Sequence, residues 1–121
     1  MTAMQGSFLR FYLTERHWLH GMPLWKWLLR TAHGMNIRGG SAFHAMAGFG
    51  HHHVMHEDRF IELGGSLIVE VEFVVSEDEK RRLLDLVSAE KTRLFYAEIP
   101  ARFGEVDPDA TVATPVPQGD S

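Results

Sequence analysis

The chain has 121 residues, of which 45% are hydrophobic and 23% are charged, and this length and composition predict one globular domain. A net charge of −4 argues against a nucleic-acid-binding module, which normally presents a basic face. The chain contains no cysteine, which excludes disulfides, thiolate nucleophiles and cysteine zinc sites.

No targeting or membrane-spanning segment is apparent. The first ten residues, MTAMQGSFLR, lack the basic region and the long apolar region of a signal peptide. No run approaches the ~18 apolar residues that span a bilayer. We therefore expect no membrane insertion and a cytoplasmic location.

The first half of the chain predicts a strand, a helix and a second strand. Polar and apolar residues alternate over Phe8–Thr14, which is typical of a strand. Pro23 suits the first turn of a helix, and apolar residues recur at helical spacing over residues 24–32. Asn36 follows as the expected left-handed stop, and Ser41–Met46 is a short second strand.

The second half repeats this order. Leu67–Val75 alternates clearly and predicts a strand. Ser76 and Glu79 have the spacing of a capping box, which predicts that a helix starts there. A fourth strand is expected over Thr92–Ile99, ending at Pro100.

These elements define one domain, residues 1–103, followed by a flexible Pro-rich tail, residues 104–121. Residues 47–60 have no period and are expected to form a long loop between the two halves.

Two βαβ halves predict an α+β, ferredoxin-like fold with a four-stranded antiparallel sheet and two helices on one face. The other face is also semi-apolar, since it is expected to carry Phe8, Tyr12, Ile68 and Val74. An apolar sheet face without helices is usually covered in an assembly, so we expect a homo-oligomer.

Two segments carry a resemblance to a known family. Residues 18–24 read WLHGMPL and residues 41–50 read SAFHAMAGFG. Together with the helix between them, they resemble a PII-like family long catalogued as a domain of unknown function, over Phe8 to Ile99. Its members tend to have a Gly-x-Pro-Leu helix start and a Gly-Phe-Gly at the base of a loop. Here Asn36 stands where the family commonly has glycine, and His44 where it often has a basic residue.

The resemblance implies a ferredoxin-like homotrimer that transduces signals. Proteins similar to PII bind adenine nucleotides between subunits. They change the shape of a long loop, which would be residues 47–60 here, that contacts a partner such as a transporter or an enzyme.

The Gly-Phe-Gly segment is the first candidate binding element. Glycines allow backbone amides to approach an anionic ligand and to form a nest for it. Arginines near it by topology can bind phosphate. The expected ligand-binding residues are Ala47, Gly48, Phe49, Gly50, His44, Arg38, Arg59 and Arg102. The alternative is an ordinary turn whose Phe49 packs into the core.

The loop histidines are the second candidate. His51, His53 and His56 could bind zinc, nickel or copper, because neutral imidazole is a suitable ligand for these metals. This favours an alternative function as a transition-metal-binding or metal-tolerance trimer. A polar loop without metal is the simpler interpretation.

The sequence shows no motif of catalysis. It contains no Gly-x-Ser-x-Gly, no P-loop and no His-Glu-x-x-His. We therefore expect a binding and signalling protein, not an enzyme.

Overall fold

The computed structural model describes residues 3–49 and 68–109. The elements in chain order are β1 (Met4–Thr14), β2 (Trp18–Leu19), β3 (Met22–Pro23), α1 (Leu24–Gly34), β4 (Gly40–His44), β5 (Ile68–Ser76), α2 (Glu77–Ala89) and β6 (Phe95–Phe103).

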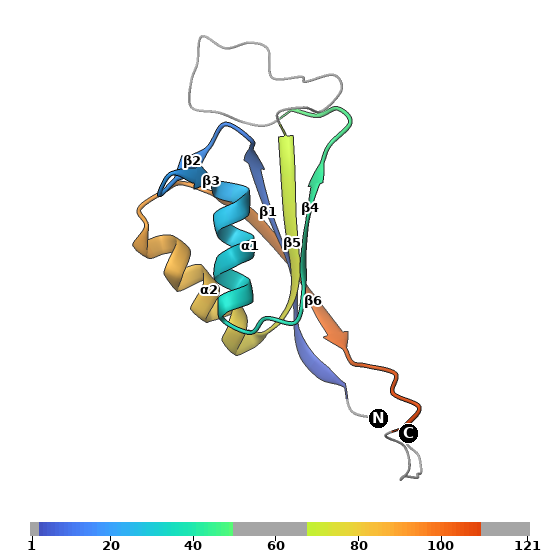
Figure 1. The fold of residues 1–121 in the computed structure, drawn as a ribbon. Coiled ribbons are helices and arrows are strands. Elements are labelled where there is room, and N and C mark those ends of the chain that lie inside the picture. The colour runs from blue at the N-terminus through green and yellow to red at the C-terminus, as the bar shows by residue number, and fades with distance from the viewer. Residues whose placement is uncertain (1–2, 50–67, 110–121) are drawn as a thin grey trace.

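Four strands form one sheet in the order β4-β5-β1-β6, and each strand is antiparallel to its neighbours. Both helices cover the same face of this sheet, with α1 against β4 and β5 and α2 against β1 and β5 (Figure 1). The predicted α+β fold with a four-stranded antiparallel sheet and two helices on one face is confirmed.

The core lies between the sheet and the helices. From Ser7 onward in β1 and throughout β5, every second residue faces the helices and is buried, as the alternation predicts. Burying one such side chain contributes about 1.5–3 kcal/mol, so this layer is the main source of stability. The buried apolar residues are Leu9, Phe11, Leu13, Leu24, Leu28, Ala32, Ile37, Val69, Val71, Phe73, Val75, Leu83 and Val87.

The end of α1 and the start of α2 have the capping structures that the sequence predicts. Asn36 has a φ of 65°, and the amide of Ile37 donates to the Ala32 carbonyl at 3.1 Å, which closes the last turn of α1. At the start of α2 the Glu79 amide donates to the Ser76 hydroxyl at 3.1 Å. The Ser76 amide donates in return to the Glu79 carboxylate at 2.9 Å.

Several predicted boundaries are wrong. The first strand begins at Met4 instead of Phe8, and the predicted connection before α1 contains the short hairpin β2–β3. β4 begins one residue before Ser41 and ends at His44. Single-sequence patterns locate strand ends poorly because pairing with a neighbouring strand decides where a strand stops.

The predicted end of the last strand at Pro100 is also wrong. β6 begins at Phe95 instead of Thr92 and continues through Pro100 to Phe103, with Pro100 opposite Ser7 of β1. Proline cannot donate to a sheet ladder, but β6 is an edge strand, and its outer side has no partner strand in the described sheet. β1 and β6 therefore continue together as a two-stranded ribbon that projects away from the helices, called the β1–β6 ribbon below (Figure 1).

Within residues 3–49 and 68–109, no helix has the length and apolar character needed to cross a bilayer. Residues 50–60 of the predicted loop and residues 110–121 of the predicted tail lie outside the described residues.

Candidate functional site

The end of β4 carries the first group of predicted binding residues. The amide of Ala45 donates to the Ile68 carbonyl at 3.0 Å, which extends the pairing of β4 and β5 one step beyond His44. The Nε2 of His44 lies 2.9 Å from a carboxylate oxygen of Glu15, the first residue after β1. His44 and Glu15 thus connect the ends of two strands that are separated by β5.

The segment after His44 presents its side chains to solvent. Ala47 is exposed, and Phe49 has 74% of its surface exposed. The alternative prediction that Phe49 packs into the core is therefore wrong within this single chain. A Cβ built at Gly48 would lie 3.0 Å from Cδ1 of Ile68, so the backbone passes close to the start of β5. We call residues 44–49 the loop base.

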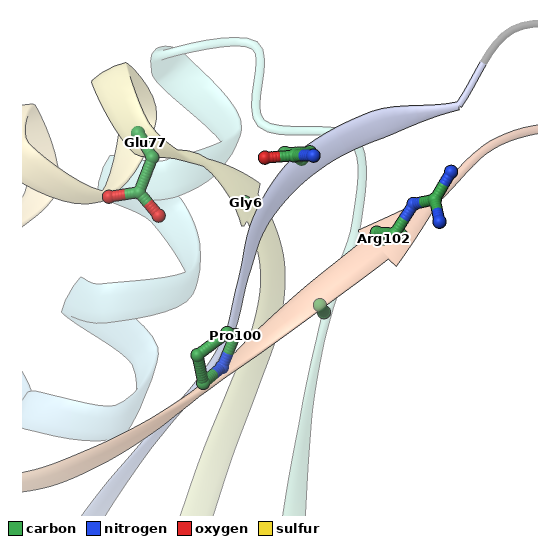
Figure 2. Close-up of a pocket in the computed structure, with 6 residues that line it drawn as sticks. Gly6, Glu77, Pro100 and Arg102 are labelled. Atoms are coloured by element: carbon green, nitrogen blue, oxygen red, sulfur yellow. The ribbon is translucent and has the colours of Figure 1, made fainter.

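The β1–β6 ribbon carries an open cavity of about 640 Å³, which we call the ribbon cavity. Figure 2 shows Glu77, from the first turn of α2, and Arg102, near the end of β6, on opposite sides of β1 in this view. The residues that line the ribbon cavity are Gln5, Gly6, Glu77, Pro100, Ala101 and Arg102.

A chain of polar contacts holds the Glu77 side of the ribbon cavity. The hydroxyl of Ser7, which is 1% exposed, donates to Glu77 at 3.2 Å. The Lys80 ammonium lies 2.9 Å from Glu77 and 2.8 Å from Glu98. The hydrogen bond from Lys80, then the positive charge of Lys80 and then the hydrogen bond from Ser7 hold the pKa of Glu77 below its ordinary value. The hydrogen bonds to Glu98 and Glu77 hold the pKa of Lys80 above its ordinary value.

Arg102 contributes the free positive charge of the ribbon cavity. Its side chain is exposed and has no ion pair with any residue that the structure describes. A guanidinium in this state can bind a phosphate or carboxylate group through two parallel hydrogen bonds. The ribbon cavity is therefore suited to an anionic group at its Arg102 side.

Within one chain the predicted binding residues form two separate groups. His44 pairs with Val69, which also pairs with Leu13, whereas Arg102 pairs with Gln5. Leu13, which is level with His44, and Gln5, which is level with Arg102, are eight residues apart along β1. This separation is about 26 Å at roughly 3.3 Å per residue. The loop base and Arg102 could meet at one ligand only if they came from different copies.

Arg38 belongs to neither group. It lies just before β4, where its Nη1 is 3.4 Å from Glu105 and its Nη2 is 4.0 Å from the sulfur of Met4. Of the remaining predicted site residues, Gly50, Arg59, His51, His53 and His56 lie outside the described residues. Among residues 3–49 and 68–109 no group of three potential metal ligands is present.

Three polar residues at the ribbon cavity were missed by sequence reasoning. These are Gln5, Ser7 and Glu77. Ser7 carried a signal, because it occupies an inward position two residues before Leu9 in the same alternating strand. No sequence signal marked Gln5 or Glu77 as site residues, since only the tertiary structure places the start of β1 beside the start of α2.

The face of the sheet opposite the helices is a further surface, which we call the open face. It combines exposed apolar side chains with a charged cluster of Arg10, Glu70 and Glu72 at its centre. Phe43, Phe95 and Ile99 are 49%, 70% and 62% exposed. Arg10 lies among them, with Nη1 3.5 Å from Glu70 and Nη2 3.3 Å from Glu72. Exposed apolar area concentrated on one sheet face is typical of an interaction surface.

Comparisons with known proteins agree with this fold. A 98-residue stretch is 28% identical to a UPF0166 protein of Aquifex aeolicus (strain VF5), which covers 81% of this chain and 93% of the relative. CPII of Thiomonas intermedia K12 is a nitrogen regulatory PII-like protein whose structure contains ADP, AMP and bicarbonate. It superposes with a TM-score of 0.55 and 15% identity, over 88% of this chain and all of CPII.

A second solved structure, from Thermus thermophilus and described as PII-like, superposes with a TM-score of 0.51 and 12% identity. It covers 85% of this chain and 91% of that chain. At such identities the likeness shows the fold, which is that of PII-like proteins. The family DUF190 (Uncharacterized ACR, COG1993) matches residues 6–95. The chain therefore belongs to the DUF190 family, which confirms the family resemblance and gives the chain the PII-like fold.

Proposed function

We propose that this chain is a cytoplasmic, non-enzymatic PII-like signalling protein that assembles as a homotrimer. In this proposal an adenine nucleotide binds in clefts between copies. Its binding changes the conformation of residues 47–60 and so regulates a partner protein such as a transporter or an enzyme.

The open face supports the assembly. Folding leaves large apolar side chains, among them Phe95 and Ile99, on the outer side of a sheet whose inner side packs against both helices. Removing apolar area from water is favourable by about 25 cal/mol per Å², so association with a second copy that covers this face is stabilised. This exposed apolar face is the observation that carries the proposal.

The separation of the two groups of binding residues supports a cleft between copies. The loop base offers backbone amides around Gly48, and Arg102 offers a guanidinium, but these lie about 26 Å apart along β1 of one chain at the usual rise of a strand. An adenine nucleotide is too short to span that distance. In an assembly through the open face, Arg102 of one copy can approach the loop base of the next.

The structural neighbour CPII, with ADP and AMP bound, indicates which effector to test first. In a PII-like mechanism the nucleotide acts by population shift. It binds one conformation of residues 47–60 more tightly than the others, and a difference of a few kcal/mol is sufficient.

Titration calorimetry on the full chain tests the nucleotide, with ATP, ADP, AMP and cyclic AMP as separate titrants. We expect saturable binding of at least one of them, and R102Q should weaken it by about tenfold or more, as expected for a charged hydrogen bond. R81Q is the matched control, because Arg81 pairs locally with Asp78 on exposed α2. Absence of heat with all four nucleotides would exclude adenine nucleotides as effectors.

Light scattering coupled to size-exclusion chromatography tests the assembly separately. A mass close to three times 13.8 kDa is expected. A monomer at micromolar concentration would remove the clefts and with them the proposed mechanism.

A further inference from the structure

A second cavity lies between the last turn of α1 and the start of β4, and we call it the α1–β4 groove. Its volume is about 540 Å³. The floor is apolar and contains Ala32, Ile37 and the ring of Phe73, all of which are buried. It belongs neither to the ribbon cavity nor to the loop base, with which it shares no lining residue.

The rim of the α1–β4 groove is basic. Arg30 and His33 are exposed side chains of α1, and Arg38 comes from the segment before β4. No acidic residue lines the groove. Neither Arg30 nor His33 has an ion pair among the described residues. Two guanidinium groups above an apolar floor favour a ligand with an anionic group and an apolar body.

Most carbonyl groups at the end of α1 are already hydrogen-bonded within the chain. Met35 donates to the Thr31 and Ala32 carbonyls, and Asn36 donates to the His33 carbonyl at 3.0 Å. These backbone bonds satisfy the Thr31, Ala32 and His33 carbonyls, so the arginines of the rim have to outweigh only the remaining negative end of the helix dipole.

Two glycines on the groove have no explanation within the single chain. A Cβ built at Gly34 or Gly39 would meet no atom within 4 Å, and neither residue has a left-handed φ. Gly34 is moreover the last residue of α1, and glycine weakens a helix relative to alanine. Gly40 differs, since its Cβ would lie 2.4 Å from the Phe73 ring. A molecule that lies against the backbone would require small residues at Gly34 and Gly39.

We propose that the α1–β4 groove binds a small organic anion, with its carboxylate or phosphate between Arg30 and Arg38 and its apolar body on the Phe73 side. Arg38 then serves this second site instead of the nucleotide. Glu105, 3.4 Å from Arg38, is an internal competitor that the ligand must displace. Because Glu105 is the second residue after β6, ligand binding in the groove releases the segment that follows Arg102.

The test is a titration of the full ¹⁵N-labelled chain with phenyl phosphate, followed by amide NMR shifts. We expect saturable shifts of the Gly34, Gly39 and Gly40 amides, which lie on the groove. Benzoate replaces the phosphate by a carboxylate and shows which anion is preferred. Phenol lacks the charge and inorganic phosphate lacks the apolar body, so both should bind more weakly.

Three variants make the assignment specific. R38Q should weaken phenyl phosphate binding by about tenfold. E105Q should strengthen it by about two- to fivefold, the usual effect of removing one exposed ion pair. R81Q should leave it unchanged.

Two results would overturn the proposal. One is that the three glycine amides do not move with either aromatic anion. The other is that ADP displaces phenyl phosphate from the groove, which would make the groove part of the nucleotide site. Unchanged binding by R38Q would overturn the assignment of the anion to Arg38. The proposal stands independently if no nucleotide binds.

Discussion

Arg10 of β1 lies directly opposite Glu72 of β5, and its Nη2 is 3.3 Å from the Glu72 carboxylate. Glu70 lies 3.5 Å from the same guanidinium, which also stacks 5.5 Å from the ring centre of Phe8. The Nε of Arg10 is buried and has no hydrogen-bond partner among the described residues. A charged group with an unused donor therefore occupies the centre of the open face.

This arrangement predicts that Arg10 matters more for assembly than for folding of the single chain. In R10Q the Glu70 and Glu72 carboxylates lose their shared counterion and become desolvated when a second copy covers them. We expect the dissociation constant of the assembly to rise by about tenfold or more, a factor equal to about 1.4 kcal/mol. Sedimentation equilibrium measures this directly. R81Q, on exposed α2, should assemble normally, and unchanged assembly of R10Q would contradict the role of Arg10.

Gly6 predicts a large effect on stability. A Cβ at this position would lie 1.9 Å from the Val75 carbonyl oxygen, so alanine forces β1 and β5 apart where the β1–β6 ribbon leaves the sheet. Overpacking of this kind costs about 1–3 kcal/mol, and we expect G6A near the upper value because backbone atoms cannot rotate away. Urea unfolding at fixed protein concentration measures it.

The matched control for G6A is G39A. No atom lies within 4 Å of a Cβ built at Gly39, so alanine there should be neutral or stabilise by about 0.4–1 kcal/mol. Equal unfolding midpoints for G6A and the natural sequence would show that β1 and β5 do not approach so closely.

Glu77 predicts a pH dependence of stability. Its pKa is lowered from 4.5, chiefly by the hydrogen bond from Lys80. The ionised form is therefore favoured in the folded state, and its stabilisation is complete above the ordinary pKa of 4.5. It is lost as the pH falls through the lowered folded pKa. Unfolding midpoints of the natural sequence and E77Q should differ most at neutral pH and converge as the pH falls below the lowered pKa of Glu77.

Replacing Lys80 tests whether its hydrogen bond lowers the pKa of Glu77. In K80Q the carboxylate of Glu77 loses its principal partner, so its pKa should move back toward 4.5. Carbon NMR of the Glu77 side chain measures the pKa in each protein. An unchanged Glu77 pKa in K80Q would show that another group lowers it.

The sequence alone determined the elements that local patterns encode. Alternation in Leu67–Val75 and the Ser76–Glu79 capping box predicted β5 and the start of α2, and the structure confirms both within a residue. Asn36 predicted the left-handed stop of α1 because its side chain tolerates a φ of 65°. The two βαβ halves then predicted the sheet, since few ways of packing such units bury both helices.

The tertiary structure decided what depends on residues far apart in the chain. The sequence predicted that the last strand stops at Pro100, but the strand continues because its outer edge has no partner strand in the described sheet to receive an N–H group. Arg38 and Arg102 were predicted to serve one site with the loop base between copies, and this stays a prediction. Only the strand register shows that Arg102 lies far from the loop base of its own chain. Alternation shows which face of the sheet a side chain lies on, but not which residue of the neighbouring strand lies opposite it, and that register decides which side chains meet.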